Sequence, residues 1–514
     1  MIKRYAAIFI GSDKCEIIVG QRGKGTVNIL DRANYPIDFG YQSFNQRRID
    51  ITSVYSLCRI LNTYIEIARG YDVESVDILF TSTLREAKNR RYVLEQIKSS
   101  TGCEVRLLEQ EEEIGMIYKY AMLKCAPLFT EDFLAEGILL ASIANGHTSS
   151  AILKEGIIDF YQVQKLGYLR LREMFSFMEA RAENSEGLME AYFGVSLKET
   201  VAELKDRKIP HMIVVAREAE GMAKLCGLED KKPYHKISRG AFDALYQEIR
   251  GLSPNQLARK YPFLDKNSAE IIKHSLIFYL KLLDDTKIEG LILVHLNVCD
   301  AMVQAKLGIT REQGLKEWLD DCTLALVRRM GQRYGVDQAH SAAVEKLAGK
   351  IFDSLKKRFN LGRRERTLMT LAVWLMDMGR FVSQGRGDAI NHVLVAHSDI
   401  IGLSEADKRI VGAILDGLRV EPFDETRLEK DLSAKQQIMA AKLIVILKLA
   451  VALDKSHQQK ISRIQCRVEG TTFIVTARST ENIQLEAYFF DACLGSIAEV
   501  FGLQARLIIK REKI

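Results

Sequence analysis

The sequence has little proline, no closely paired cysteines and no long apolar run. With only seven prolines among 514 residues and no low-complexity stretch, we expect domains that pack closely without long linkers. The nine cysteines include no CxxC pair, which argues against a zinc site or disulfide framework and predicts reduced thiols in a cytoplasm. No apolar run approaches the roughly 20 residues of a membrane span. The opening MIKRYAAIFIGSDKC is polar too soon for a signal peptide and predicts a first strand.

Acidic residues are also missing from a loop where phosphate chemistry would need them. Residues 136–156, EGILLASIANGHTSSAILKEG, predict a strand, a tight turn at Asn145-Gly146 and a second strand. Strand ends and turn N–H groups of this kind suit a bound phosphate. Hydrolysis would also need carboxylates to hold a metal ion and aim a water, and none lies between Glu136 and Glu155.

The overall composition is that of an ordinary soluble globular protein. Hydrophobic residues make up 47% of the chain and charged residues 27%. At roughly 150 residues per domain, the length predicts three or four domains. The net charge of +6 is small for this length and favours acidic partners only weakly.

Two strand–turn–strand segments indicate an internal duplication. Residues 5–20, YAAIFIGSDKCEIIVG, have the same layout as 136–156, and Gly11 and Gly146 fall at comparable points of the two turns. The layout predicts two similar α/β halves, about 1–127 and 128–305, that face each other across a cleft.

Further elements of the first half follow from apolar spacing and from capping signals. Residues 82–102 predict one helix, with Thr83 and Glu86 spaced as a capping box and Gly102 at its end. Another helix is expected to start at the acidic run Glu111-Glu112-Glu113. The other expected elements are a helix over 51–73 and strands over 76–81 and 104–108.

The second part of the chain changes character. From about 306 the apolar spacing fits a period of 3.6 almost throughout, which predicts a helical domain over 306–461. From 462 to 514 the pattern returns to strands with one helix, which predicts a small α+β domain.

Several segments together resemble the exopolyphosphatase / guanosine pentaphosphate phosphohydrolase (Ppx/GppA) family. They occur in the family's order over nearly the whole chain. The similar segments are TSTLREAKNR (81–90), EQEEEIGMIY (109–118), LGYLRLREMF (166–175), RYGVDQAHSAAVEKLAGKIFDSL (333–355) and LAVALDKSH (449–457). The resemblance implies a multidomain α/β plus α fold: two actin-like (RNase H-type) domains, an HD-like helical domain and a small C-terminal α+β domain. It also implies hydrolysis of terminal phosphates from polyphosphate or pppGpp with Mg²⁺.

The acids and glycines of the family's phosphate loops are largely absent. The aspartate that ends the family's first strand is Phe9 here, and the acids at the ends of its second loop are Ser142 and Ser149. A third, glycine-rich turn is similar to AREAEGM (216–222), and the arginine of a fourth run falls on Cys299. Four altered phosphate elements predict a site that has lost hydrolysis, and the acidic ligands of Mg²⁺ are largely missing.

Other family positions are retained. Glu113 matches the general base and is the candidate catalytic residue, although an acid in the first turn of a helix can serve only to cap it. Arg85 matches a phosphate-contacting arginine, and its alternative is a surface charge. The remaining candidate phosphate-binding residues are Gly11, Ser12, Asn145, Gly146 and Thr148. Asp13 could replace a missing acid, but it lies four residues past Phe9 and has a different reach.

With these acids gone, the cleft is expected to be more electropositive. The cations nearest in sequence are Arg22, Lys24, Arg85 and Lys88.

The helical domain shows the same kind of loss. An HD phosphohydrolase holds its metal with histidines and a His-Asp pair. The residues at the positions of this His-Asp pair are Met376 and Asp377, and a further histidine of the family aligns near Ile390. His392, His397 and His457 remain, but they are scattered, so no metal site is expected. A basic segment, LKKRFNLGRRER (355–366), is either a second contact for a long polyanion or a solvated helix end.

Three functions remain open from the sequence. The first is a protein of this family that binds polyphosphate or a guanosine phosphate of the (p)ppGpp type with little or no hydrolysis. The second is an active hydrolase with a rearranged site built on Glu113. The third is an assembly protein with a vestigial cleft. In each case we expect a cytoplasmic homodimer without membrane or specific nucleic-acid partners.

Overall fold

The computed structural model divides the chain into two compact units, Met1–Cys322 (unit 1) and Thr323–Ile514 (unit 2). It describes residues 3–24, 26–179, 185–205, 207–228, 232–284, 286–308, 312–419 and 432–511. No helix in these ranges combines the length and apolar character needed to cross a membrane.

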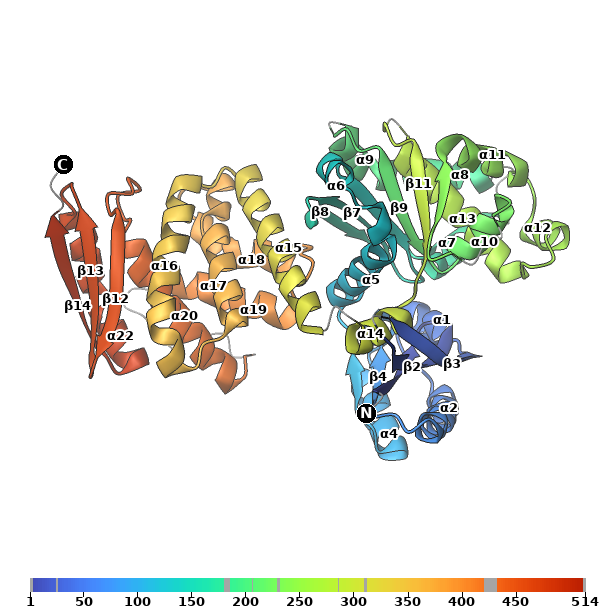
Figure 1. Cartoon of the computed structure of the whole chain (residues 1–514), viewed down its shortest axis with the longest axis horizontal. Helices are drawn as coiled ribbons and strands as arrows, with labels where there is room; N and C mark the ends of the chain where they lie inside the picture. Colours follow the sequence, from blue (N-terminus) through green and yellow to red (C-terminus); the bar gives the residue numbers. More distant parts are fainter. Residues whose placement is uncertain are drawn as a thin grey trace. The chain divides into compact units, whose positions relative to one another are not determined.

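The first sheet of unit 1 has the strand order β3-β2-β1-β4-β5 (Figure 1). The first three strands form an antiparallel meander, and β4 and β5 continue the sheet in parallel from β1. Because helices cover both faces of this sheet, the sequence of β1 is an almost continuous apolar run rather than an alternation of apolar and polar residues. The strands are β1 Arg4–Ile10, β2 Lys14–Arg22, β3 Val27–Pro36, β4 Ser75–Phe80 and β5 Val105–Leu107.

The second sheet of unit 1 repeats this topology. Its order is β10-β11-β9-β6-β7-β8, in which β6–β8 form the meander and β9 and β11 run parallel to β6. One antiparallel strand, β10, is added at the edge. The strands are β6 Ile138–Ile143, β7 Thr148–Lys154, β8 Ile157–Gln164, β9 His211–Ala216, β10 His235–Ser238 and β11 Gly290–His295. The predicted duplication is therefore present in strand order and direction, and not only in the two hairpins.

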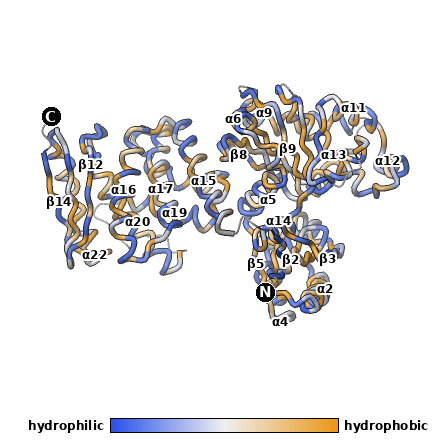
Figure 2. The backbone as a smooth tube through the Cα atoms, viewed as in Figure 1, coloured by the Kyte–Doolittle hydropathy of each residue, from blue (hydrophilic) through white to orange (hydrophobic). Residues whose placement is uncertain are grey.

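Helices pack against both sheets. Apolar residues gather along the central strands of the second sheet and along α13 (Figure 2). The helices of the first half are α1 Phe39–Tyr41, α2 Ile51–Gly70, α3 Ser82–Glu86, α4 Arg90–Thr101, α5 Gln110–Cys125 and α6 Glu131–Glu136, with short turns η1 Gln42–Gln46 and η2 Ala126–Leu128. Those of the second half are α7 Tyr168–Glu179, α8 Ser185–Ser196, α9 Lys198–Lys205, α10 Ala219–Leu225, α11 Arg239–Ile249, α12 Pro254–Lys260, α13 Lys266–Leu283 and α14 Val298–Leu307.

The single helix expected over 82–102 is wrong, because the chain breaks between α3 and α4. Ala87 adopts an extended conformation, and the Asn89 amide forms two hydrogen bonds with the backbone of Ile49, at 2.7 and 3.1 Å. The N-cap is Thr81, whose hydroxyl accepts from the N–H of Thr83, so the proposed Thr83/Glu86 capping box is also wrong. A distant backbone segment thus decides where this helix is interrupted.

Unit 2 is a helical bundle with a small sheet of order β12-β13-β14. Its helices are α15 Glu312–Arg333, which includes the point of division, α16 Gln338–Phe359, α17 Arg363–Leu375, α18 Asn391–Ala396, α19 Glu405–Leu418 and α20 Ala434–Ala452, with short turns η3 Met378–Phe381 and η4 Gly387–Ala389. The C-terminal elements are β12 Arg463–Glu469, β13 Thr472–Ser479, α21 Gln484–Ala492, α22 Leu494–Phe501 and β14 Gln504–Arg511. One helix was expected after β13, but two short ones follow each other. The finer division into four domains stays a prediction.

Candidate functional site: a cavity between two facing turns

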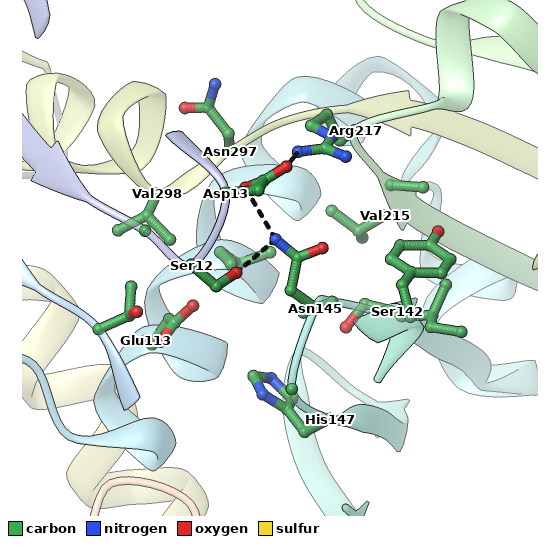
Figure 3. Close-up of a pocket in the computed structure, with 18 of the residues that line it drawn as sticks. Ser12, Asp13, Glu113, Ser142, Asn145, His147, Val215, Arg217, Asn297 and Val298 are labelled. Carbon is green, nitrogen blue, oxygen red and sulfur yellow. Dashed lines mark hydrogen bonds and ion pairs between the residues drawn. The ribbon is translucent and has the colours of Figure 1, made fainter. Parts of the chain in front are cut away.

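A cavity of about 130 Å³ lies where the β1–β2 turn and the β6–β7 turn face each other (Figure 3). The first turn contributes Gly11, Ser12 and Asp13, and the second contributes Asn145 and Gly146. The beginnings of α5 and α14 and the end of β9 complete its wall. The two halves of unit 1 therefore meet at equivalent positions of their duplicated topology.

Backbone hydrogen bonds fix the first turn. The N–H of Gly11 donates to the carbonyl of Lys14 at 2.9 Å, which closes the turn. The N–H groups of Gly40 and Ile37 donate to the carbonyls of Ser12 and Asp13 at 2.8 and 2.9 Å. The carbonyls of this turn are thus turned toward the protein.

The second turn is held by the segment that opens α7. The N–H groups of Tyr168 and Leu169 donate to the carbonyls of Ala144 and Asn145 at 2.9 and 3.1 Å. This approach requires glycine at 167, since a Cβ there would lie 2.2 Å from the carbonyl of Asn145. The glycine of LGYLRLREMF is therefore needed to seat the turn.

Side chains of the two turns bond directly to each other. The Asn145 amide Nδ2 donates to Ser12 Oγ at 2.6 Å and to Asp13 Oδ1 at 2.9 Å (Figure 3). Arg217, which follows β9, donates from Nη1 to Asp13 Oδ2 at 2.6 Å. We call these contacts among Ser12, Asp13, Asn145 and Arg217 the loop bridge. It spans the cavity from one half of unit 1 to the other.

Arg217 also binds its neighbour, Glu218, from Nε to Oε1 at 2.9 Å. Burial alone would lower the pKa of Arg217, but the carboxylates of Glu218 and Asp13 raise it above its ordinary value. Glu218 further accepts from the Tyr168 hydroxyl at 3.1 Å. Both carboxylates beside Arg217 are thus already engaged.

Buried hydroxyls lie at Ser142 and Ser149, where the resemblance to the family led us to expect acids. Ser142 and Ser149 are cross-strand partners in β6 and β7, and their Oγ atoms lie 2.8 Å apart. The Tyr118 hydroxyl lies 2.6 Å from Ser149 Oγ, and burial raises the pKa of Tyr118 above its ordinary value. The three hydroxyls form a neutral hydrogen-bonded chain that leaves no negative charge for a cation.

Glu113 lines the same cavity from the first turn of α5. Burial raises the pKa of Glu113 to about 7, although the Arg85 charge acts to lower it. Its Oε2 atom is buried and has no hydrogen-bond partner among the described residues. Such a carboxyl near neutral pKa could accept a proton from a water, which is the requirement for a general base.

His147 faces the cavity from the end of the second turn. Burial lowers the pKa of His147 to about 4, with further lowering by the charges of Arg85 and Arg170. The imidazole is therefore neutral at physiological pH and adds no positive charge for a phosphate.

The structure gathers most, but not all, of the candidate site residues. Gly11, Ser12, Asn145, Gly146 and Glu113 line the cavity, whereas two others do not. Thr148 is buried at the start of β7, and Arg85 in α3 forms an ion pair with Glu109 at 3.0 Å.

The sequence did not single out Lys14, His147, Tyr168 or Asn297 as lining residues. Tyr168 could have been identified from the sequence, because it follows Gly167 in a segment that resembles the family.

The expectation of a more electropositive cleft is wrong for this cavity. Arg22, Lys24 and Lys88 do not line it, and its two lining cations are Lys14 and Arg217. Lys14 pairs with Glu16 at 2.6 Å, and Arg217 is paired as described above. Three acidic side chains also line the cavity, so their charge offsets that of the cations.

The acidic side chains do not fit a magnesium site. Mg²⁺ takes near-octahedral oxygen coordination, usually through one or two carboxylates with waters and substrate oxygens. Asp13 and Glu218 are directed to Arg217, and only Glu113 retains an oxygen without a protein partner. Within the described ranges, no group of three or more His, Cys, Asp or Glu side chains is arranged to hold a metal ion.

In unit 2, Met376 and Asp377 line a separate cavity together with Asn391. Cations of the basic segment bind acids of unit 2: Lys356 and Arg366 both contact Asp353, at 2.9 and 2.7 Å. Arg364 contacts Asp407 at 2.6 Å. These pairs favour the interpretation of the segment as a helix end over that of a polyanion contact.

The duplicated sheets define a protein of the actin-like ATPase fold, with the candidate site between the two halves of unit 1. The Ppx/GppA phosphatase family model matches residues 21–209, and the model of domain III of the Ppx/GppA phosphatases matches residues 324–491. The chain belongs to the Ppx/GppA phosphatase family.

Curated relatives match over almost the whole chain. It is similar to a guanosine-5'-triphosphate,3'-diphosphate pyrophosphatase of Aliivibrio fischeri strain MJ11, with 20% identity over 94% of this chain and 95% of the relative. The protein of the same description from strain ATCC 700601 / ES114 is 21% identical over 90% of this chain and 88% of the relative.

Solved structures match the fold. An exopolyphosphatase from Cytophaga hutchinsonii has a TM-score of 0.51 and 14% identity, covering 60% of this chain and 100% of the other. The Ppx/GppA family member of Aquifex aeolicus has a TM-score of 0.50 and 17% identity, covering 59% of this chain and 97% of the other.

Proposed function

We propose that this protein binds polyphosphate or a guanosine phosphate of the (p)ppGpp type in the cavity of unit 1, with little or no hydrolysis. The descriptions of the Aliivibrio fischeri relatives name a guanosine phosphate, and that of the Cytophaga hutchinsonii protein names polyphosphate. The cavity lies at the junction of two phosphate-loop-like turns. Binding and hydrolysis make different demands on such a site, and its residues meet them unequally.

Backbone donors support anion binding. Among the described residues, the N–H groups of Ser12, Asp13, Asn145 and Gly146 donate to no protein acceptor. Successive free N–H groups in a turn form a concave site for an anion. Two such turns face each other here, so a phosphate chain could take donors from both halves once the side chains of the loop bridge are displaced.

The observation that argues against hydrolysis is that the acidic side chains are either ion-paired or replaced by hydroxyls. Asp13 and Glu218 are ion-paired with Arg217, and the Ser142 and Ser149 hydroxyls replace the two acids of the second loop. A metal ion that polarises phosphate and lowers the pKa of a water supplies several kcal/mol of transition-state stabilisation. Without its ligands, that contribution is lost while the backbone donors remain.

Calorimetric titration with polyphosphate, ppGpp and pppGpp, each with and without Mg²⁺, tests the proposal. We expect binding that does not depend on Mg²⁺, and phosphate release at least about a thousandfold slower than that of an active phosphatase of the family. Absence of binding to all three would contradict the proposal and support a vestigial cleft.

The second candidate function is an active hydrolase that uses Glu113 as its base. The observation that favours it is the buried, unpartnered Oε2 of a carboxyl whose pKa is about 7. If the protein turns over pppGpp or polyphosphate rapidly and Glu113→Gln abolishes turnover while binding persists, this candidate replaces the first.

A further inference from the structure

Unit 2 contains a cavity of about 160 Å³ whose lining combines charged and apolar side chains. It is bounded by the end of α17, by α18 and α19, and by α20 and α21. A single buried water needs roughly 10–15 Å³ of such space. The cavity is therefore large enough for a small ligand.

Cations outnumber carboxylates on its wall. Arg380, Arg419, Lys448 and Lys455 line the cavity, against Asp377 and Asp388. The nearby Asp416 pairs with Arg419 at 3.4 Å and does not line it. Lysine and arginine are favoured partners of phosphate groups. Arg380 is paired with Asp377 at 3.2 Å, and with Asp416 counted the four cations face three carboxylates, so the remaining net positive charge favours an anion such as a phosphate monoester.

Lys448 is the buried cation of the cavity wall. It lies on α20, within a run from Leu443 to Leu453 that is otherwise apolar, and it is only 7% exposed. Lysine is rarely buried to this degree, because removing its charge from water is costly. Lys448 also interacts with other groups of the protein, and its position on the cavity wall would bring its ammonium group close to a bound anion.

Lys455 is the exposed cation of the wall. Its Nζ sits 4.5 Å from the centre of the Phe489 ring, and both side chains line the cavity. Leu415, Leu418 and Val451 add apolar surface. Polar and apolar groups share the wall about equally, so a charged group and an organic group could both find partners there.

Two stacked histidines complete the wall. The rings of His340 and His457 are 3.6 Å apart and nearly parallel, at 6°. Their Nδ1 atoms lie 2.8 Å from Asp454 and 3.2 Å from Asp337, respectively. Because the carboxylates hold Nδ1 of each ring, Nε2 is the ring nitrogen left to interact with a ligand.

We propose that this cavity binds the phosphate group of a small phosphate monoester, between Lys448 and Lys455, with the organic part against Phe489. The site is distinct from the cavity of unit 1 and does not rest on the function proposed for that cavity.

The test is calorimetric titration of the full-length protein with phenyl phosphate, with benzoate as the monoanionic comparison. We expect phenyl phosphate to bind more tightly than benzoate. Lys448→Met and Lys455→Gln should each weaken phenyl phosphate binding about tenfold, through loss of one charge-assisted contact. Lys442→Met, on the same helix but outside the cavity wall, should leave binding unchanged.

Two of the variants, Lys455→Gln and an additional Lys14→Met, keep the result interpretable. Because Lys455 is exposed, Lys455→Gln is expected to fold even if Lys448→Met does not, which an unchanged Tm would verify. Lys14→Met alters only the cavity of unit 1 and should not affect phenyl phosphate binding. Absence of phenyl phosphate binding, equal binding by Lys455→Gln, or loss of binding in Lys14→Met would each overturn the proposal.

Discussion

At the scale of single residues, the cavity of unit 1 holds buried groups whose charge is set by burial rather than by their type. Glu113 has its pKa raised to about 7, whereas His147 has its pKa lowered to about 4. Both groups are thus shifted toward their neutral forms by loss of contact with water. The identity of Glu113 was available from its sequence motif, but its buried, unpartnered oxygen was not.

The shifted pKa of Glu113 predicts a pH-dependent stability difference between the wild type and Glu113→Gln. The unfolded chain has a glutamate pKa of about 4.3, so between that value and about 7 the native state holds one more proton than the unfolded state. The wild type's free energy of unfolding therefore falls as the pH rises through this window and then levels off. Relative to Glu113→Gln, the wild type should lose roughly 3 kcal/mol between about pH 4 and pH 8.

Urea denaturation of both proteins at several pH values measures this difference. His147 and His274 have lowered pKa values and act in the opposite direction, since their contribution is lost as the pH falls. They are present in both proteins, so they cancel in the difference. A difference that does not change with pH would show that Glu113 is ionised in the native state across this range.

A second prediction at this scale concerns the buried hydroxyl chain. Ser149→Glu restores an acid that the family pattern contains, but it places a charge beside Tyr118 and Ser142 without a cation. We expect it to lower the free energy of unfolding by about 3–5 kcal/mol at pH 7, because a buried unpaired charge is costly. Ser149→Ala, which only breaks the chain, should cost about 1–2 kcal/mol. Equal effects of the two substitutions in urea denaturation would contradict this account.

At the scale of elements, the two turns of unit 1 are joined by side-chain contacts. The strands on either side of each turn could be predicted from apolar runs and glycine. The loop bridge could not, because Ser12 and Asn145 are 133 positions apart. The break between α3 and α4 has the same origin, since Asn89 is held by Ile49 from another part of the chain.

A double-mutant cycle on Asp13 and Arg217 tests whether the loop bridge couples the two halves. These side chains are both 29% exposed and lie 2.6 Å apart. With Asp13→Ala and Arg217→Ala, we expect a coupling energy of about 1–3 kcal/mol in urea denaturation. The exposed pair Glu66 and Arg69 is the matched control and should give at most about 0.5 kcal/mol. If both cycles give the same small value, the bridge does not stabilise the fold.

At the scale of the whole molecule, each unit has apolar cores of its own. Among the described residues, one cluster surrounds each sheet of unit 1, and a large cluster joins the helices and the small sheet of unit 2. Separate cores are the usual basis of separate cooperative unfolding. The ligands proposed for the two units should accordingly act on different transitions.

We therefore expect two transitions in thermal unfolding of the full-length protein. Polyphosphate, if it binds in unit 1, should shift only the transition of that unit to higher temperature. At a concentration one hundred times its Kd, it should raise that unit's free energy of unfolding by about 2.7 kcal/mol. Phenyl phosphate should raise only the transition of unit 2. Calorimetry with each ligand alone checks the assignment, and a single transition raised by both ligands would contradict it.

The sequence by itself determined the hairpins, the change from α/β to helical character and the family, because these depend on local periodicity and on short motifs. It also placed Gly11, Ser12, Asn145, Gly146 and Glu113 at one site through the resemblance. Only the tertiary structure decided the chemistry of that site. Whether a carboxylate can hold a metal depends on which charges face it across the cavity, and Asp13 meets Arg217 from 204 positions away. Such pairings are set by the packing of the two halves, and no local pattern encodes them.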